Sequence, residues 1–244
     1  MFPLKNSFLN RIIHALYQHA FWLYDPLYYF YKQTAEKKAI RFFRQKIKRG
    51  MCVLDIGANI GFYTRLFSSL VGETGRVIAF EPERLNFAYL QRSTRQLGNV
   101  ECYAYAVGAE SGRTFLYLSE DMNVDHHAYQ TGEDRSKVEV PGISIDHFTE
   151  PTQTIDFVKV DVQGYEFAVF QGMKNLLEQS QNMMIYSEIY PFGLKYNGVS
   201  PRELISFLEQ TGYKVDLLGR EISLFDEKVD DPHFYSDFYA EKTC

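Results

Sequence analysis

The segment Val53–Phe62 constrains the possible folds more than any other part of the sequence. A short apolar run, typical of a buried strand, ends there in Asp55, and Gly57 and Gly61 follow just before an apolar pattern with helical spacing. Glycine permits a tight turn and lets a ligand approach the backbone closely. The first turn of a helix presents free N–H groups that suit a carboxylate or a phosphate. The segment therefore predicts a strand–turn–helix unit that binds a cofactor.

Apolar runs and helical spacing alternate along the chain after this segment. The expected strands are 51–56, 76–80, 100–106, 155–160 and 182–189. The expected helices include 62–70, 84–97 and 200–210, the last with Ser200 as its cap and Pro201 at its first position. This order implies a parallel sheet with right-handed crossovers. The expected fold class is α/β: a doubly wound, Rossmann-like, mostly parallel sheet with a closing antiparallel strand and an N-terminal helical extension.

Residues 107–150 and the C-terminal region depart from this rhythm. Thr114–Leu118 and Lys137–Val140 predict two short strands joined by a polar loop. Tyr213–Leu217 and Ile222–Phe225 predict a closing antiparallel pair. Beyond Asp226 the sequence is acidic and aromatic, and the pattern assigns no element to it.

The N-terminal region differs from the rest in charge. Residues 1–50 carry +8 and the remaining residues −13, within a net charge of −5. We expect helices in this region, with a turn or kink at Pro26. The expected parts of the chain are an N-terminal basic, aromatic helical extension (1–50), the domain that contains the sheet (51–225) and a C-terminal tail (226–244).

A second local signal is Glu81, which follows the second predicted strand and precedes Pro82. An acid at this place can accept hydrogen bonds from both hydroxyls of a ribose. A dinucleotide fingerprint would have glycine at positions 57, 59 and 62, but this chain has Asn59 and Phe62. The sequence contains no Walker-type Gly-Lys-Ser/Thr motif either. S-adenosylmethionine is therefore the adenosine-containing cofactor that suits the pattern best.

These residues belong to separated blocks whose order and spacing resemble the FkbM family of methyltransferases. The blocks are Asp55–Gly61, Gly75–Pro82, Ala106–Gly108, Ile155–Glu166 and Ser187–Glu188. The resemblance covers about residues 50–220. It implies that 51–225 is a methyltransferase domain that uses S-adenosylmethionine to methylate a hydroxyl, often on a sugar or a natural product. Gln163 stands where the family most often has Glu, which removes one charge from that position.

The motifs and the resemblance together give a set of expected cofactor-binding residues. These are Asp55, Gly57, Asn59, Gly61, Phe62, Glu81, Pro82, Ala106, Val107 and Asp161.

The expected catalytic residues are those that could orient an acceptor hydroxyl or remove its proton. Asp161 ends a central strand at the edge where ligands bind in such sheets, and Glu166 lies in the first turn of the next helix. Glu166 could instead simply complement the helix N-terminus. His126 could act as a base because its ordinary pKa is near neutrality, with Asp125 beside it. Adjacent residues rarely converge on one ion, so we predict no metal ligand in that loop.

Composition limits the partners and the location. The net charge of −5 gives no sign of nucleic-acid binding, so a small-molecule or glycan acceptor is the expected partner. Three cysteines without a pairing spacing argue against a disulfide scaffold or a zinc site, so a cytoplasmic location is the default. No stretch reaches the roughly 18 to 20 apolar residues of a membrane span.

The basic N-terminal region leaves three roles open. It could dock on the anionic inner face of a membrane as a peripheral contact, cover the acceptor site, or form a homodimer contact. It also supports a rival function, a non-catalytic module that keeps the methyltransferase fold and recruits a glycan-processing partner. A nicotinamide-dependent oxidoreductase is a third and weaker interpretation, because Asn59 and Phe62 depart from the dinucleotide fingerprint.

Overall fold

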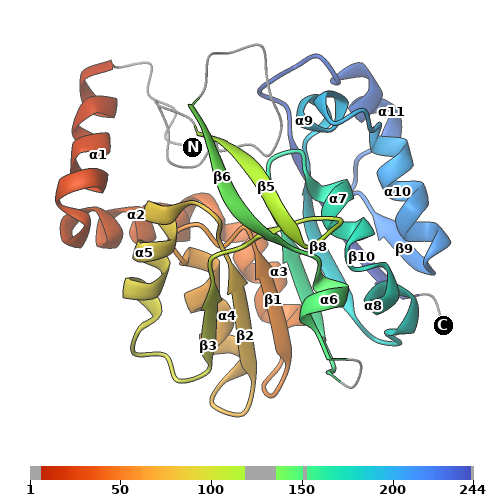
Figure 1. Cartoon of the computed structure of the whole chain (residues 1–244), viewed down its shortest axis with the longest axis horizontal. Helices are drawn as coiled ribbons and strands as arrows, with labels where there is room; N and C mark the ends of the chain where they lie inside the picture. The colour runs from red at the N-terminus through yellow and green to blue at the C-terminus, as the bar shows by residue number, and fades with distance from the viewer. Residues whose placement is uncertain (1–6, 119–135, 151–152, 243–244) are drawn as a thin grey trace.

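A computed structural model describes residues 7–118, 136–150 and 153–242, and its main feature is a seven-stranded sheet (Figure 1). The strands of this sheet are β1 (Cys52–Ile56), β2 (Arg76–Phe80), β3 (Val100–Tyr103), β7 (Phe157–Val160), β8 (Met184–Ile189), β9 (Tyr213–Asp216) and β10 (Ser236–Lys242). A smaller sheet contains β4 (Ala106–Val107), β5 (Gly112–Leu118) and β6 (Ser136–Ile143). The helices are α1 (Ser7–His19), α2 (Phe21–Ala35), α3 (Lys37–Lys46), α4 (Phe62–Val71), α5 (Arg84–Thr94), α6 (Ile145–Phe148), α7 (Glu166–Gln171), α8 (Lys174–Gln179), α9 (Pro191–Tyr196), α10 (Pro201–Gln210) and α11 (Ile222–Glu227).

The strand order shows where a ligand can bind. The strands lie in the order β3-β2-β1-β7-β8-β10-β9, and only β10 runs antiparallel to its neighbours. The chain passes from β1 to β2 on one side and later enters β7 on the other side of β1. Ligands of open α/β sheets bind at the carboxyl ends of the strands beside such a reversal. The predicted doubly wound, mostly parallel sheet with a closing antiparallel strand is confirmed.

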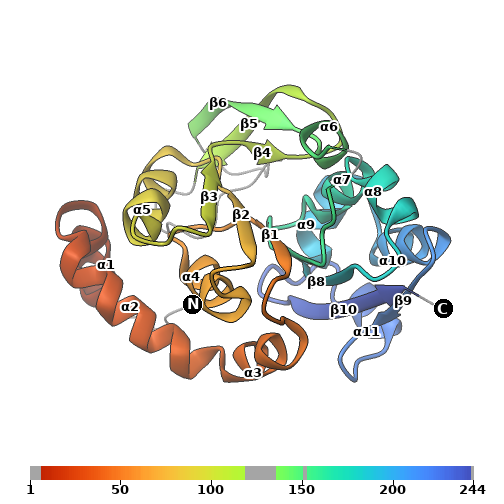
Figure 2. The ribbon, with the colours of Figure 1, turned by 90° about the horizontal axis from the view of Figure 1, so that it is seen from below.

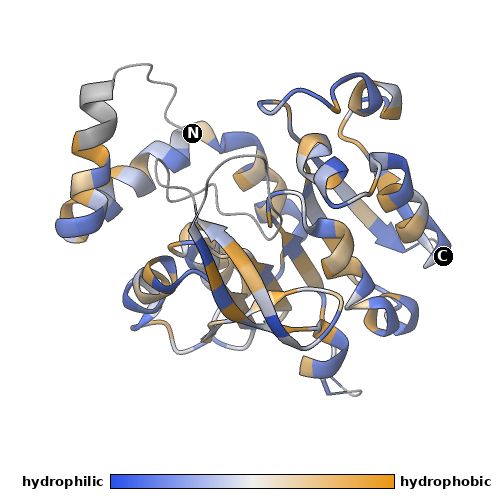
Figure 3. Cartoon of the chain, turned by 45° about the horizontal axis from the view of Figure 1, so that its top comes forward, coloured by the Kyte–Doolittle hydropathy of each residue, from blue (hydrophilic) through white to orange (hydrophobic). Residues whose placement is uncertain are grey.

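Both faces of the sheet are covered, which explains why its central strands read as apolar runs (Figure 2). Along β1, Leu54 and Ile56 join a core formed with α6, α7 and α8, whereas Val53 points to a second core. Phe43 of α3 and Phe67 of α4 belong to this second core. The helices carry hydrophilic residues between their apolar ones, as expected for elements with one face in water (Figure 3).

The N-terminal helices wrap around the outside of the second core (Figure 2). Phe21 stacks on Tyr89 of α5 with ring centroids 3.6 Å apart, and Arg65 of α4 holds Asp25 through two hydrogen bonds. Of the turn or kink predicted at Pro26, the turn is wrong, because α2 continues through this residue and the chain breaks at Ala20 instead, whereas the kink stays a prediction. Proline removes one helical hydrogen bond, and the packing of the inner face of α2 outweighs that loss.

Of the two segments predicted to form the closing antiparallel pair, Tyr213–Leu217 contains β9, but its predicted partner Ile222–Phe225 is not a strand. Residues 222–225 lie in α11 rather than in a strand, and β9 pairs with β10, for example Tyr213 with Lys242. A short apolar run fits a strand and a buried helix turn equally well, which explains the error. The segment after Asp226 therefore supplies a strand inside the sheet, between β8 and β9.

Two local predictions are confirmed. The two short strands predicted at Thr114–Leu118 and Lys137–Val140 lie within β5 and β6, which pair antiparallel. Ser200 caps α10, because its hydroxyl accepts a hydrogen bond from the backbone N–H of Glu203 while the Glu203 carboxylate accepts one from the backbone N–H of Ser200.

Candidate active site

A cavity of about 370 Å³ opens at the carboxyl ends of the central strands. The ends of β1, β2, β7 and β8, the start of β10 and the inner side of α2 all contribute to its lining. This volume falls in the range of small-molecule sites. The cavity therefore lies at the reversal of strand order, where the topology places a ligand.

The turn after β1 forms one wall of this cavity. Gly57 has a φ of +76°, and a Cβ there would lie 1.9 Å from the carbonyl oxygen of Asp161. Glycine is thus required because the ends of β1 and β7 approach each other closely. A Cβ on Gly61 would lie 2.8 Å from Oγ of Ser93 in α5, so Gly61 serves helix packing and does not line the cavity.

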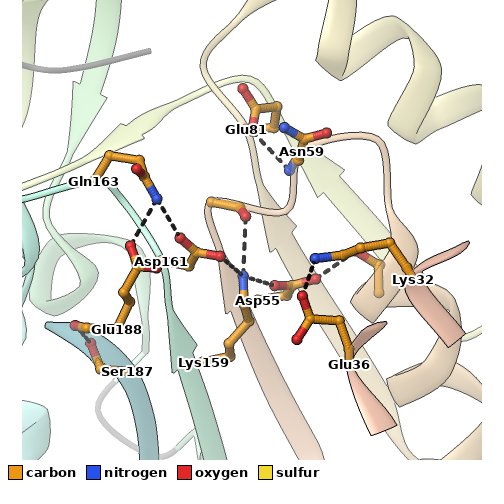
Figure 4. A network of polar contacts seen from close by, with 12 residues as sticks. Lys32, Glu36, Asp55, Asn59, Glu81, Lys159, Asp161, Gln163, Ser187 and Glu188 are labelled. Carbon is orange, nitrogen blue, oxygen red and sulfur yellow. Dashed lines mark hydrogen bonds and ion pairs between the residues drawn. The ribbon is translucent and has the colours of Figure 1, made fainter. Parts of the chain in front are cut away.

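Glu81 stands at the end of β2 and lines the same wall. The backbone N–H groups of Asn59 and Glu83 each donate a hydrogen bond of 2.9 Å to its carboxylate, one to each oxygen, and Figure 4 shows the bond from Asn59. Burial raises the pKa of Glu81 to about 7, against the lowering effect of these two N–H groups. Each oxygen keeps a further acceptor position. The arrangement fixes a carboxylate at the edge of the cavity, where it can accept hydrogen bonds from a ligand's hydroxyls.

Lys159 is a buried cation at the centre of the site. Its ammonium lies 3.5 Å from Oδ1 of Asp55 and 3.3 Å from Oδ2 of Asp161, and it donates a hydrogen bond to the carbonyl oxygen of Gly57 (Figure 4). Although burial opposes it, the charges of Asp161 and Asp55 raise the pKa of Lys159. Thr64 donates a further hydrogen bond of 2.6 Å to Asp55. Lys159 thus ties the ends of β1 and β7 together.

Asp161 and Glu188 form a bridged pair of carboxylates on the other side of the cavity. The side-chain amide of Gln163 lies 3.2 Å from Oδ1 of Asp161 and 2.8 Å from Oε2 of Glu188 (Figure 4). Burial alone would raise the pKa of Asp161, but the Lys159 ammonium holds this pKa below its ordinary value. Burial and then the charge of Asp161 raise the pKa of Glu188 well above its ordinary value. The pair therefore combines an ionised carboxylate with one that retains its proton more readily.

The two ends of the chain complete the cavity. Tyr28 and Lys32 of α2 line it together with Glu36, and Lys32 forms an ion pair of 2.7 Å with Glu36. Tyr235 and Asp237 line it from the start of β10. Burial raises the pKa of Asp237 to about 6. This side of the cavity is thus built from residues about 200 positions apart in the sequence.

The structure brings most of the predicted site residues together. Those that line the cavity are Gly57, Asn59, Phe62, Glu81, Pro82, Ala106, Val107 and Asp161. Asp55 and Glu166 are fully buried beside it and do not line it. Glu166 instead accepts a hydrogen bond of 2.8 Å from the backbone N–H of Gly164. His126 and Asp125 lie outside the described residues.

The residues that sequence reasoning missed are Lys159, Glu188, Asp237, Lys32 and Glu36. Lys159 could have been found from the sequence, because a lysine inside a buried strand predicts acidic partners close to it. Glu188 lies near the carboxyl end of β8, the neighbour of β7 in the sheet, so it shares the ligand-binding edge with Asp161. The other three lie in segments whose position depends on contacts distant in sequence.

Comparisons with known proteins agree with this geometry. The model of the methyltransferase FkbM domain matches residues 55–215. The hexuronic acid methyltransferase AglP of Haloferax volcanii is 28% identical over 185 residues, which are 75% of this chain and 71% of AglP.

Solved structures show the same fold at low identity. The methyltransferase FkbM of Methylobacillus flagellatus is 15% identical with a TM-score of 0.51 over 79% of this chain, which covers only 43% of that protein. A Streptococcus mutans protein in complex with SAH is 14% identical, with a TM-score of 0.52 over 85% of this chain and 97% of its own. Aeropyrum pernix fibrillarin with natively bound S-adenosylmethionine is 15% identical, with a TM-score of 0.50 over 84% of this chain and 74% of its own. The fold is therefore that of the S-adenosylmethionine-dependent methyltransferases, and the chain belongs to the FkbM methyltransferase family.

Proposed function

We propose that this protein is an O-methyltransferase that uses S-adenosylmethionine to methylate a hydroxyl of a sugar, a glycan or a glycosylated natural product. The observation that carries the proposal is one cavity with two chemically different sides. On one side Glu81 is held by backbone N–H groups, and on the other Gln163 bridges the carboxylates of Asp161 and Glu188. The hexuronic acid methyltransferase among its relatives supports a sugar acceptor.

The residues on the first side fit S-adenosylmethionine. The Glu81 carboxylate is fixed with acceptor positions to spare, which suits the two hydroxyls of a ribose. Ala106, Val107 and Pro82 add small and apolar surface for a base. When bound, the cofactor supplies a methyl group on a sulfonium, which an acceptor oxygen can displace from sulfur.

The second side would bind and deprotonate the acceptor. Asp161 is ionised and its side chain is 36% exposed, so it can accept a hydrogen bond from a hydroxyl that enters the cavity. The hydroxyl proton would pass to the bridged carboxylate pair as the new carbon–oxygen bond forms. Gln163 donates to both carboxylates and keeps them next to each other, whereas Lys159 offsets one negative charge.

The charges in the cavity favour a neutral sugar over a uronic acid. Glu36 is paired with Lys32 and Asp161 with Lys159, but the described residues of the lining offer no cation within ion-pair distance of Glu188 or Asp237. The carboxylate of a uronic acid would be repelled by the ionised Asp161 and, above about pH 6, by Asp237. We therefore expect a preference for uncharged hydroxyl-rich acceptors, in contrast to the substrate named for AglP.

Calorimetry with Glu81→Ala tests the cofactor half of the proposal. The full chain should bind S-adenosylmethionine, and Glu81→Ala should bind it at least about tenfold more weakly, since removal of one charge-assisted hydrogen-bonding group costs about 1.5–3 kcal/mol. Glu110→Ala, an exposed substitution away from the cavity, is the matched control. Absence of binding by the unaltered chain to both S-adenosylmethionine and its demethylated product would contradict the proposal.

Labelling of cell extracts tests the acceptor half. The protein and isotopically labelled S-adenosylmethionine are incubated with an extract, and mass spectrometry then searches for labelled glycans. We expect label on an uncharged sugar and its loss with Asp161→Asn. Label found only on uronic acids would contradict the charge argument, and label found only on protein or nucleic acid would contradict the sugar acceptor.

A further inference from the structure

The outward face of α2 is apolar and exposed, unlike that of an ordinary surface helix. We define the α2 apolar face as Trp22, Leu23, Pro26, Leu27 and Phe30, all of which are exposed. The exposed fractions of Trp22, Leu27 and Phe30 are 65%, 62% and 74%. The opposite face of the same helix packs inward through Phe21, Tyr24 and Tyr28. Contiguous apolar surface of this kind marks an interaction site.

Basic side chains lie beside this face and in the helix that follows it. A groove of about 370 Å³ is lined by Trp22 and Pro26 together with Arg92 and Arg95 at the end of α5. The next helix, α3, exposes four cations, namely Lys37, Lys38, Arg41 and Arg44. None of these six cations forms an ion pair with a carboxylate in the part of the chain that the structure describes.

We propose that the α2 apolar face docks on an anionic phospholipid bilayer, with these cations bound to the headgroups. An apolar stripe rich in Trp, Phe and Leu beside basic residues is the pattern of helices that lie in a membrane interface. Among the described residues, no helix is long and apolar enough to cross a bilayer. The positive charge of these groups selects an anionic surface over an uncharged protein patch.

The position of α2 connects this surface to the cavity. Tyr24, Tyr28 and Lys32 of α2 line the cavity, while Trp22 and Phe30 point outward from the same helix. A helix with its side chains is about 10 Å across. Docking would therefore hold the acceptor side of the cavity one helix width from the headgroups.

The sequence provides its own reporter for this contact, because Trp22 is the only tryptophan of the chain. Fluorescence and co-sedimentation are measured with vesicles of phosphatidylcholine plus phosphatidylglycerol and with vesicles of phosphatidylcholine alone. We expect a blue shift of the Trp22 emission and sedimentation with the anionic vesicles only, and weaker binding as salt is raised. The full chain is used throughout.

Two pairs of variants separate the apolar and the electrostatic parts. Leu27→Ser/Phe30→Ser should abolish the shift, whereas the matched control Phe115→Ser/Val138→Ser, which removes exposed apolar groups of the small sheet, should leave it unchanged. Arg92→Gln/Arg95→Gln should weaken binding to anionic vesicles about thirtyfold, whereas Lys174→Gln/Lys214→Gln should have little effect. Circular dichroism confirms that each variant is folded.

Three results would overturn the proposal. The first is no sedimentation with anionic vesicles. The second is binding that Leu27→Ser/Phe30→Ser leaves intact. The third is a Trp22 blue shift that grows with protein concentration in the absence of vesicles, because the face would then bind a second copy of the chain.

Discussion

Glu166 illustrates how a buried carboxyl group can serve structure rather than chemistry. Its side chain is fully buried, and one oxygen accepts the hydrogen bond from Gly164 in the turn after β7. Burial raises the pKa of Glu166 to about 7, although the backbone N–H of Gly164 acts to lower it. The folded protein therefore keeps a proton at pH values where the unfolded chain, with a pKa near 4.5, has already released it.

This pKa gives the first prediction. The stabilisation from Glu166 is fully present below about pH 4.5 and is lost as pH rises through about 7, so the free energy of unfolding should fall between these values. Glu166→Gln stays neutral and can still accept the Gly164 hydrogen bond. Between about pH 5 and about pH 8, we expect the free energy of unfolding of this variant to fall by about 2–3 kcal/mol less than that of the unaltered chain, as measured by urea unfolding. Glu178→Gln, in an exposed position, is the control, and equal falls in both variants would contradict the prediction.

Single residues of the site were predictable where one local segment contains the signal. Glu81 follows a strand and precedes Pro82, so its place at the sheet edge could be read from a few neighbours. The local sequence could not show which residues of the motif line the cavity and which only pack against neighbouring elements. Asp55 and Gly61 belong to the motif as clearly as Gly57 does, yet their side-chain positions face Lys159 and α5.

At the scale of elements, one ion pair joins α2 to α4. Two hydrogen bonds of 3.0 and 2.7 Å join Arg65 to Asp25, and the Arg65 guanidinium also lies 4.6 Å from the ring centroid of Tyr29. Both members of the ion pair are about one-fifth exposed. Such a pair lies between the exposed and the buried kinds in its contribution to stability.

Arg65→Gln should loosen the N-terminal helices. Loss of the guanidinium leaves Asp25 partly buried without its partner, which should cost about 1–2 kcal/mol. Limited proteolysis should then cut between residues 20 and 36 faster than in the unaltered chain. Arg76→Gln is the matched control, because Arg76 also binds a carboxylate through two nitrogens, in the exposed pair with Glu101. Equal cleavage rates for the two variants would count against this role of Arg65.

The element predictions failed where contacts distant in sequence decide the outcome. Pro26 is a helix breaker by local rules, yet the inner face of α2 packs well enough to continue the helix through it. Residues 222–225 had the composition of a strand, but β10 occupies the position next to β9. Nothing in the local pattern of either segment reports which neighbour it will have.

At the scale of the whole molecule, the last strand belongs to the core. Phe238 of β10 is fully buried and packs in the same core as Phe170 of α7. Phe238→Ala should therefore lower the free energy of unfolding by about 3–5 kcal/mol in urea titrations. Tyr235→Ala, at a position that is about half exposed, should change it by much less. Similar losses for both variants would show that β10 is not part of the core.

The contact between the two ends of the chain has a consequence for how acceptor choice could change. Lys46 of α3 lies 3.5 Å from Glu241 of β10, and the rings of Phe42 and Tyr239 meet 5.0 Å apart between the same two elements. Both elements fall outside the matched domain of residues 55–215. Exchange of the two terminal segments together, as one graft, would therefore keep their mutual contact while it changes the wall of the cavity that Tyr28, Lys32 and Asp237 line.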